Sequence, residues 1–469
     1  MRKISAGSLA AFVMFGASYL ISPGFALCIL LSALFFYAVR RNTPEEDRRF
    51  VLFLISAALI IRVAGLIILQ YKCISTGQLD IFGDAQDNII QGINISDSIR
   101  NMKEIPVTPQ SILTSRYNTH SMTIFNGIFF LLFGYDIVSL KYINILAICA
   151  TAWIIYDFAK NIYSGAAGRI ALAIILFWPT IFIWSLTDLK ESHLLFTVAC
   201  SFWLLERAAR EKAGHRKAAF ILLSALSAFY FVLLKIKLML PVFILSASLI
   251  ALYNALHYGF SRNPALSRKV LYILLVPAVA ALMAFGDRIL RAANEIYALI
   301  LHYNIGFLNS GGWNVNLIGD QSQNFFTLQF ILKYIAKAWV VFFLEPLPWH
   351  FYSRSLMATY PMMLAWYIIA AFAAAGVVRA YYAGRSKEAF AMLTFTAIYV
   401  TVVGMSVANI GTLIRFRDVI VPIVAIFAGI GMSNMPPAGK GKPKEQVDTK
   451  DGTNGQGHEN HKKTRREWL

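Results

Sequence analysis

The sequence predicts an all-helical protein that crosses a membrane about twelve or thirteen times. Of its 469 residues 58% are hydrophobic, and the mean hydropathy is +0.58. Only 14% are charged, whereas soluble domains approach about a quarter. Apolar runs of roughly 16–22 residues recur along the chain, and helices of that length span or nearly span a hydrocarbon core of about 30 Å.

The net charge of +18 does not indicate nucleic-acid binding. The lysines and arginines gather in short segments at the ends of apolar runs, where they set orientation in the membrane. No basic folded domain is predicted that could carry a nucleic acid. Cys28, Cys73, Cys149 and Cys200 lie mostly inside apolar runs and lack metal-ligand spacing, so neither a disulfide framework nor a zinc site is predicted.

The first elements set the orientation. Residues 6–39 are apolar but interrupted at Ser22-Pro23-Gly24, which predicts a tight hairpin of two short helices with both ends cytoplasmic. Residues 40–49 contain four arginines and form an inner loop. Residues 50–70 then cross outward. The polar segment that follows, 72–118, is the first of two long extracytoplasmic loops.

The middle of the chain contains further apolar runs at about 120–134, 137–158, 168–184, 192–206, 218–234, 238–254 and 270–286. The charged segment 206–212 must be cytoplasmic, which places residues 185–191 outside. Strict alternation from the N-terminus places them inside instead. One of the segments between 119 and 184 is therefore expected not to cross fully.

The C-terminal third contains the second outer region, 287–361. Its apolar part, 329–345, carries Lys333 and Lys337 and is predicted to be an interfacial or re-entrant helix. The last spans are predicted at 362–380, 389–408 and 419–433. Residues 1–434 thus form one transmembrane domain, and the basic tail, 435–469, is predicted to be disordered and cytoplasmic.

Two arginines stand between the last two spans, where a cytoplasmic tail puts them on the outer face. Positive charge at Arg415 and Arg417 opposes the usual bias and suggests that they hold the phosphate of a lipid-linked substrate. Lys235 and Lys237, beside a short outer turn, and Arg116 in the first outer loop are further candidates for the phosphate. For the two lysines, snorkelling from a helix end is an equal alternative.

Carboxylates stand at two outer positions. In the first outer loop, Asp84 or Asp87 is suited to be a general base that deprotonates an acceptor hydroxyl. The alternative is a helix N-cap with acidic first-turn residues. Asp188, Lys190 and Glu191 form a second cluster, and charges beside an apolar span need a partner or water. Asp188 or Glu191 either binds a divalent metal (Mg²⁺ or Mn²⁺) beside Asp84, or Glu191 pairs with Lys190.

Glu345, Trp349 and His350 are candidates for contacts with a sugar or an acceptor. Trp349 also fits the aromatic belt at a membrane surface. A lone histidine near a membrane boundary is more often a surface residue than a ligand.

The order of these motifs resembles that of the GT-C superfamily of membrane glycosyltransferases, above all bacterial members similar to protein mannosyltransferases and lipid A aminoarabinose transferases. The similarity covers about 50–210 and resumes at 344–349 and 415–422. The matching positions are Asp84, Leu132-Phe133-Gly134, Asn144, Pro179, Asp188 or Glu191, Leu344 to Trp349, Arg415-Phe416-Arg417 and Pro422. The chain departs from the family at Asp87, where a tyrosine is common, and it lacks a large soluble domain after the last span.

The resemblance implies an inverting transfer of a sugar from a polyprenyl-phosphate donor to an acceptor hydroxyl that Asp84 deprotonates. The acceptor would be a glycan, a lipid or a protein at the outer face of a bacterial inner membrane. Some members of the family use a metal and others do not.

Two other functions fit the same sequence. A polysaccharide polymerase or ligase would use lipid-diphosphate-linked glycans, and outer-face arginines suit it equally well. A transporter or flippase for lipid-linked glycans predicts inverted repeats and polar residues at mid-membrane depth. No such repeat is evident and the charges collect on one face, which favours an enzyme.

Overall fold

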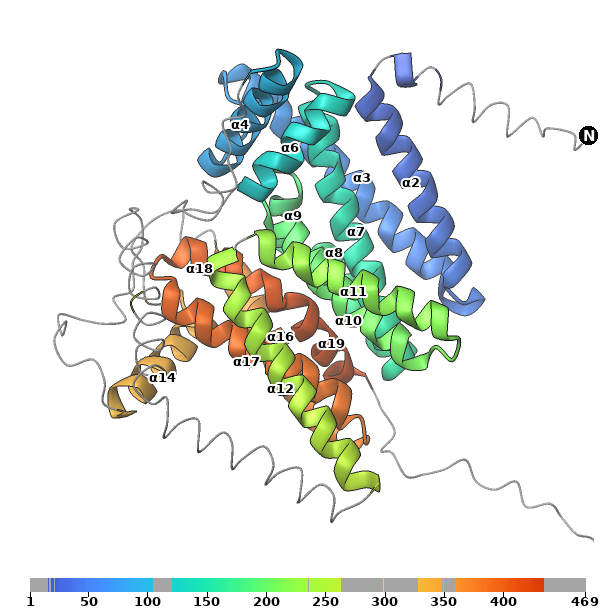
Figure 1. Ribbon diagram of the computed structural model, residues 1–469, viewed down its shortest axis with the longest axis vertical. Helices are drawn as coiled ribbons and strands as arrows, with labels where there is room; N and C mark the ends of the chain where they lie inside the picture. Colours follow the sequence, from blue (N-terminus) through green and yellow to red (C-terminus); the bar gives the residue numbers. More distant parts are fainter. Residues whose placement is uncertain are drawn as a thin grey trace, which may run out of the picture.

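The computed structural model describes residues 16, 18–20, 22–103, 120–234, 236–262, 298, 328–347, 349 and 359–433. Within these ranges the regular elements are all helices (Figure 1). They are α2 (Pro23–Asn42), α3 (Glu45–Ser75), α4 (Gly83–Arg100), α6 (His120–Phe133), α7 (Ile137–Ile162), α8 (Gly165–Phe177), α9 (Pro179–Ser185), α10 (Glu191–Arg210), α11 (Gly214–Leu234), α12 (Ile236–Arg262), α14 (Leu328–Leu344), α16 (Tyr360–Tyr382), α17 (Ser386–Ser406), α18 (Ile410–Arg417), the 3-10 turn η1 (Asp418–Ile420) and α19 (Val421–Met432).

The all-helical membrane class is confirmed. In the described ranges, six helices are long and apolar enough to cross a membrane: α2, α3, α7, α11, α16 and residues 388–406 of α17. The pair α8 and α9, bent by 57° at Trp178-Pro179, makes a seventh if it is one span. This is fewer than the twelve or thirteen spans expected from the sequence, and the expected span at 270–286 lies outside the described residues.

Helix α6 is short for a membrane span, which bears on the orientation expected between 119 and 184. Helix α6 has 14 residues and is therefore about 21 Å long, which is shorter than the hydrocarbon core. It packs against α4 at one end of the molecule, beside the top of α7 in Figure 1. Within this region, α6 is thus a segment that falls short of a full crossing.

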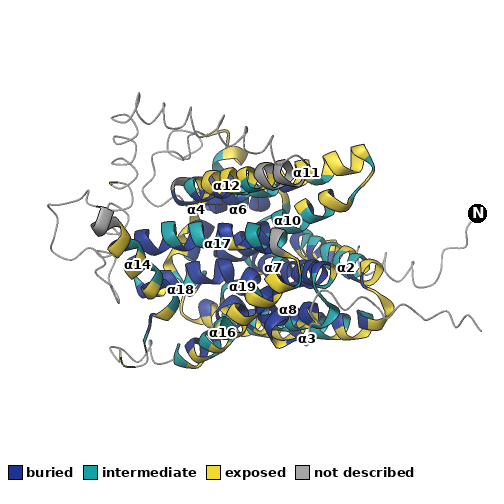
Figure 2. Cartoon of the chain, turned by 90° about the horizontal axis from the view of Figure 1, so that it is seen from below, coloured by how far each residue is buried: buried dark blue, intermediate teal, exposed yellow. Residues whose placement is uncertain are grey.

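The buried centre of the molecule is formed by α7 and α19, whereas α3, α11 and α16 carry exposed apolar residues on their outer faces (Figure 2). Every residue of α19 from Val421 to Gly431 is buried. The helix packs against α7, α8 and α16. Because lipid is as apolar as the protein interior, close backbone contact between small residues is a main source of stability in such a bundle.

Glycines allow this close contact between α16 and α19. A Cβ atom at Gly376 would overlap the carbonyl group of Phe427, and one at Gly431 would overlap the carbonyl group of Phe372. The two helices therefore touch backbone to backbone. Since α18 and η1 lead directly into α19, this packing also fixes the position of α18.

A cluster of charged and polar side chains holds α3, α7 and α8 together. Asp47, at the start of α3, accepts hydrogen bonds from Tyr156 (2.6 Å) and Lys160 (3.0 Å) of α7 and from Arg169 of α8 (2.6 Å). The aspartate is 2% exposed, and these three partners compensate its buried charge. This cluster joins α3, α7 and α8 at the end predicted to be cytoplasmic.

We expect Gly376→Ala to destabilise the protein by about 1–3 kcal/mol, because a methyl group would push α16 away from α19. Thermal unfolding in detergent would measure the loss. Gly214→Ala is the matched control, since a Cβ atom there meets no neighbour within 4 Å. Equal melting temperatures for the two variants would contradict the close packing.

Candidate functional site

Three charged side chains from distant parts of the chain meet at one place in the bundle. The Nη1 atom of Arg415 lies 3.0 Å from Oδ2 of Asp84. Its Nη2 and Nε atoms lie 2.9 Å and 3.1 Å from Oε1 of Glu191. A single guanidinium group thus joins α18 to the first turns of both α4 and α10.

The two carboxylates occupy equivalent places on their helices. Asp84 and Glu191 are both in a first helical turn, where the positive end of the helix dipole favours negative charge. The N-cap of α4 is Phe82, which makes no side-chain capping bond. Asp84 is therefore not the cap considered from the sequence; its carboxylate pairs with Arg415 instead.

Arg415 is held from its own side as well. Helix α18 begins at Ile410, and the side chain of Asn409 accepts a hydrogen bond from the backbone N–H of Thr412 (3.1 Å) and so caps it. The guanidinium of Arg415 lies 5.8 Å from the centre of the Trp184 ring, within the range of a cation–π contact. Trp184 also packs against Phe82, with 5.4 Å between ring centres.

Asp418 fixes this aromatic support. Its two carboxylate oxygens accept hydrogen bonds from the indole nitrogens of Trp178 (3.0 Å) and Trp184 (2.7 Å). The turn η1 is thereby tied to both sides of the bend between α8 and α9. Asp418 was not singled out from the sequence, although it directly follows Arg417.

Lys190 brings a second cation to the same place. Its side chain is 8% exposed, and its charge interacts with those of Glu191, Arg415 and Asp84. Among the described residues the structure records no hydrogen bond or ion pair for it. The Lys190–Glu191 salt bridge considered from the sequence is thus not formed, because Glu191 faces Arg415.

The charges alter the protonation of Asp84. Partial burial by itself would raise the pKa of this carboxyl group, but the Arg415 guanidinium beside it outweighs burial and holds the pKa below its ordinary value. Asp84 is therefore a carboxylate at neutral pH.

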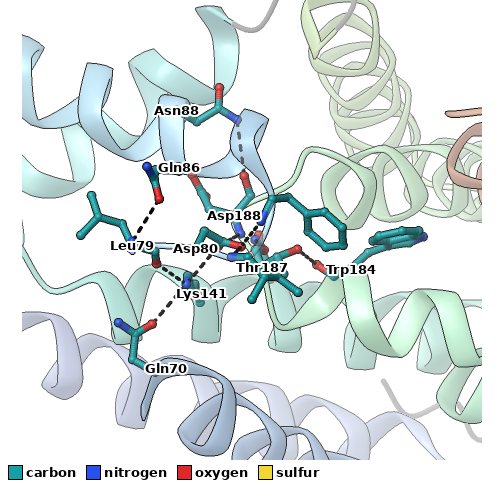
Figure 3. Close-up of polar contacts among 12 residues, drawn as sticks. Gln70, Leu79, Asp80, Gln86, Asn88, Lys141, Trp184, Thr187 and Asp188 are labelled. Carbon is teal, nitrogen blue, oxygen red and sulfur yellow. Dashed lines mark hydrogen bonds and ion pairs between the residues drawn. The ribbon is translucent and has the colours of Figure 1, made fainter. Parts of the chain in front are cut away.

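A buried polar network holds the loop between α9 and α10 (Figure 3). Asp80 and Lys141, both fully buried, form an ion pair at 3.0 Å. The Lys141 ammonium also donates to Gln70 (3.1 Å) and to the carbonyl oxygen of Leu79 (2.8 Å). On the other side, Asp80 accepts a hydrogen bond from the backbone N–H of Asp188 (3.1 Å).

Amide side chains complete the network. Asn144 donates to the carbonyl oxygen of Thr187 (2.7 Å), and Asn88 donates to that of Asp188 (3.4 Å). The loop that leads to Lys190 and Glu191 is thus pinned from α4 and α7. Asp80 was not predicted to contribute. The only sequence signal was an acidic residue four positions before Asp84.

The side chain of Asp188 contacts α6. Its side chain is buried and accepts a hydrogen bond from the amide of Asn126 on α6. Oδ1 of Asp188 and Oδ1 of Asn126 are both buried without a hydrogen-bond partner. Burial raises the pKa of Asp188 to about 7. A protonated Asp188 would supply a donor to this pair of acceptors.

The described residues do not form a metal site. Among them, no group of three histidine, cysteine, aspartate or glutamate side chains is placed to hold an ion. Asp84 and Glu191 share the Arg415 guanidinium, which already provides the positive charge that a metal would supply. The use of Mg²⁺ or Mn²⁺ stays a prediction.

Arg417 lies apart from Arg415. Its guanidinium is buried, donates to the carbonyl oxygen of Glu345 and lies 2.9 Å from the sulfur of Met363. It also faces the Trp366 ring at 5.4 Å. Protein atoms enclose its charge, and it ties α18 to α16 and to the segment after α14. The phosphate-binding role expected for Arg417 stays a prediction.

Asp87, Glu345 and Trp349 are the remaining predicted site residues whose side chains the structure describes. Asp87 is exposed one turn further along α4. Glu345 is buried and accepts a hydrogen bond from the N–H of Leu347 (3.2 Å), and Trp349 is 67% exposed. The side chain of Lys237 is not described, and Arg116, Lys235 and His350 lie outside the described residues.

No protein-family model and no curated protein matches the sequence. A search of solved structures finds the crystal structure of ArnT from Cupriavidus metallidurans bound to undecaprenyl phosphate, at 11% identity and a TM-score of 0.46. The match covers 82% of this chain and 60% of that chain, so the chain spans less than two thirds of ArnT. A similarity of this size does not place the chain in a family.

We expect Asp80→Asn to destabilise the protein by about 3–5 kcal/mol, because the buried Lys141 charge would lose its counter-charge. The double variant Asp80→Asn/Lys141→Met removes both charges and should recover much of this loss. Melting temperatures in detergent would test both. A double variant no more stable than Asp80→Asn would argue against the ion pair.

The pH dependence of stability should report on Asp188. Its pKa is raised from 3.8 to about 7 on folding, so the folded protein binds more protons than the unfolded chain between these values. The stability contributed by protonated Asp188 is therefore lost progressively as the pH rises from 3.8 to about 7. Asp188→Asn mimics the protonated acid and should remove this loss. The melting temperatures of both proteins would be measured from pH 5 to pH 8. An equal dependence on pH in the two proteins would contradict the assignment.

Proposed function

We propose that the protein is a membrane glycosyltransferase of GT-C type. It transfers a sugar from a polyprenyl-phosphate-linked donor to an acceptor hydroxyl at the outer face of a bacterial inner membrane. The observation that carries this proposal is the contact between Asp84 and Arg415, which are 331 residues apart in sequence. A base and a phosphate-binding cation thereby lie side by side.

The site matches the needs of this reaction. The donor's leaving group is an anionic phosphate at the membrane surface, and its developing charge needs cations at that depth. Arg415 supplies a planar guanidinium suited to phosphate oxygens, and Lys190 supplies a second charge nearby. The first turns of α4 and α10 add the positive ends of two helix dipoles.

The chemical step follows from these positions. The Asp84 carboxylate takes the proton of the acceptor hydroxyl while that oxygen forms a bond to the anomeric carbon. The bond from this carbon to the phosphate oxygen breaks, and its electron pair leaves with the polyprenyl phosphate. Attack on the face opposite the phosphate inverts the anomeric configuration. Arg415 and Lys190 stabilise the phosphate as its negative charge increases.

Glu191 acts as a positioning residue. Its carboxylate is buried and holds two nitrogens of Arg415, which leaves Nη1 directed at Asp84 and the more exposed side. The orientation of the guanidinium thus depends on Glu191. The Trp184 ring contacts the same group.

Asp84→Asn should lower the rate of sugar transfer by about 10²–10⁴-fold, because the proton acceptor is lost. The assay uses purified protein in lipid nanodiscs, a panel of polyprenyl-phosphate sugars and candidate acceptors. Asp87→Asn, with the same charge change one turn away, should stay near the wild-type rate. Full activity of Asp84→Asn, or loss only in Asp87→Asn, would remove Asp84 as the base.

Arg415→Ala should also lower the rate, by about 10²–10³-fold, and Arg415→Lys should retain part of it. Movement of intact lipid-linked glycan across the membrane without bond cleavage would instead support a transporter. Polymer formation from a lipid diphosphate would support the polymerase alternative.

A further inference from the structure

The two partners of Arg415 differ greatly in burial. Glu191 is 1% exposed at its side chain, whereas Asp84 is 55% exposed. Glu191 contacts two nitrogens of Arg415, whereas Asp84 contacts one. The first pair is enclosed by protein, and the second is open to solvent. Only the Asp84 contact can be exchanged without exposing a buried, unpaired carboxylate.

We propose that the Asp84–Arg415 ion pair is a latch of the ligand-free enzyme. The phosphate of the incoming donor displaces the Asp84 carboxylate from Nη1 of Arg415, and this exchange releases Asp84 to accept the acceptor's proton. The inference rests on the proposed function, and it adds an order of events to the site.

The charges favour this exchange. Asp84, Glu191, Lys190 and Arg415 together carry two negative and two positive charges. A phosphate that takes the place of Asp84 keeps a negative group on Nη1. It also brings an anion close to Lys190, for which the structure records no hydrogen bond or ion pair among the described residues. Arg415 thus exchanges one anionic partner for another, and the Lys190 ammonium gains an anionic partner.

The latch also explains why the base would be inactive without donor. A carboxylate paired with a guanidinium is a weak proton acceptor, and Arg415 holds the pKa of Asp84 below its ordinary value. When phosphate takes over Nη1, this effect on Asp84 is reduced. The base is then strengthened only when a sugar donor is present, so acceptor deprotonation follows donor binding.

Binding of sugar-free polyprenyl phosphate tests the latch. Asp84→Asn removes the competing carboxylate and should bind this probe about three- to tenfold more tightly than wild type, although the same variant loses transfer activity. Asp87→Asn is the matched control for removal of one exposed negative charge from α4, and its affinity should change by less than twofold. Polyprenol without phosphate should bind all three proteins equally.

A double-mutant cycle separates exchange at Arg415 from simple repulsion between Asp84 and phosphate. In an Arg415→Gln background, Asp84→Asn should no longer tighten binding, because there is no guanidinium to release. If Arg415→Gln does not fold, Arg415→Gln/Glu191→Gln serves as the background, since it removes both charges of the buried pair. An unchanged gain in this background would overturn the latch.

The same data distinguish failure of the latch from failure of the proposed function. Wild-type affinity for polyprenyl phosphate in the Arg415-substituted protein would remove Arg415 as the phosphate ligand, and the function with it. Weaker binding in that protein, combined with unchanged or weaker binding in Asp84→Asn, would leave the function standing and reject the latch.

Discussion

The candidate site depends on the pairing of Arg415 with Glu191. A guanidinium that is 16% exposed and a carboxylate that is 1% exposed are costly to bury singly, so each fixes the other. This pair sets the distance between α18 and α10. Because Asp84 reaches the free side of the same guanidinium, it also sets the place of α4. Three helix ends are thereby brought to one point.

Neighbouring groups support this arrangement. The Asp80–Lys141 pair and its amide neighbours hold the loop before α10, and Asp418 holds the two tryptophans beside α18. Backbone contact between α16 and α19 fixes the helix that follows α18. The two polar supports use buried groups with hydrogen-bond partners, which makes the site more rigid than an exposed loop would be.

The charges have unequal roles in the proposed chemistry. Buried groups such as Glu191 and Asp80 orient their neighbours, while the more exposed Asp84 is free to change its partner. A transferase that activates its base only after the donor phosphate has arrived would avoid deprotonating an acceptor at an empty site. The difference in exposure between two carboxylates on one arginine is the physical basis of this order.

The sequence by itself determined the membrane class, because hydropathy and charge act locally along the chain and need no knowledge of contacts. It also pointed to Asp84, Glu191 and Arg415, since ionised residues beside apolar runs are rare and costly. The tertiary structure decided which charges meet. It paired Glu191 with Arg415 rather than with Lys190, enclosed Arg417, turned Asp188 toward Asn126, and revealed Asp80 and Asp418 as supports. These outcomes depend on how α4, α10 and α18 approach one another, and no local pattern encodes a contact between residues hundreds of positions apart.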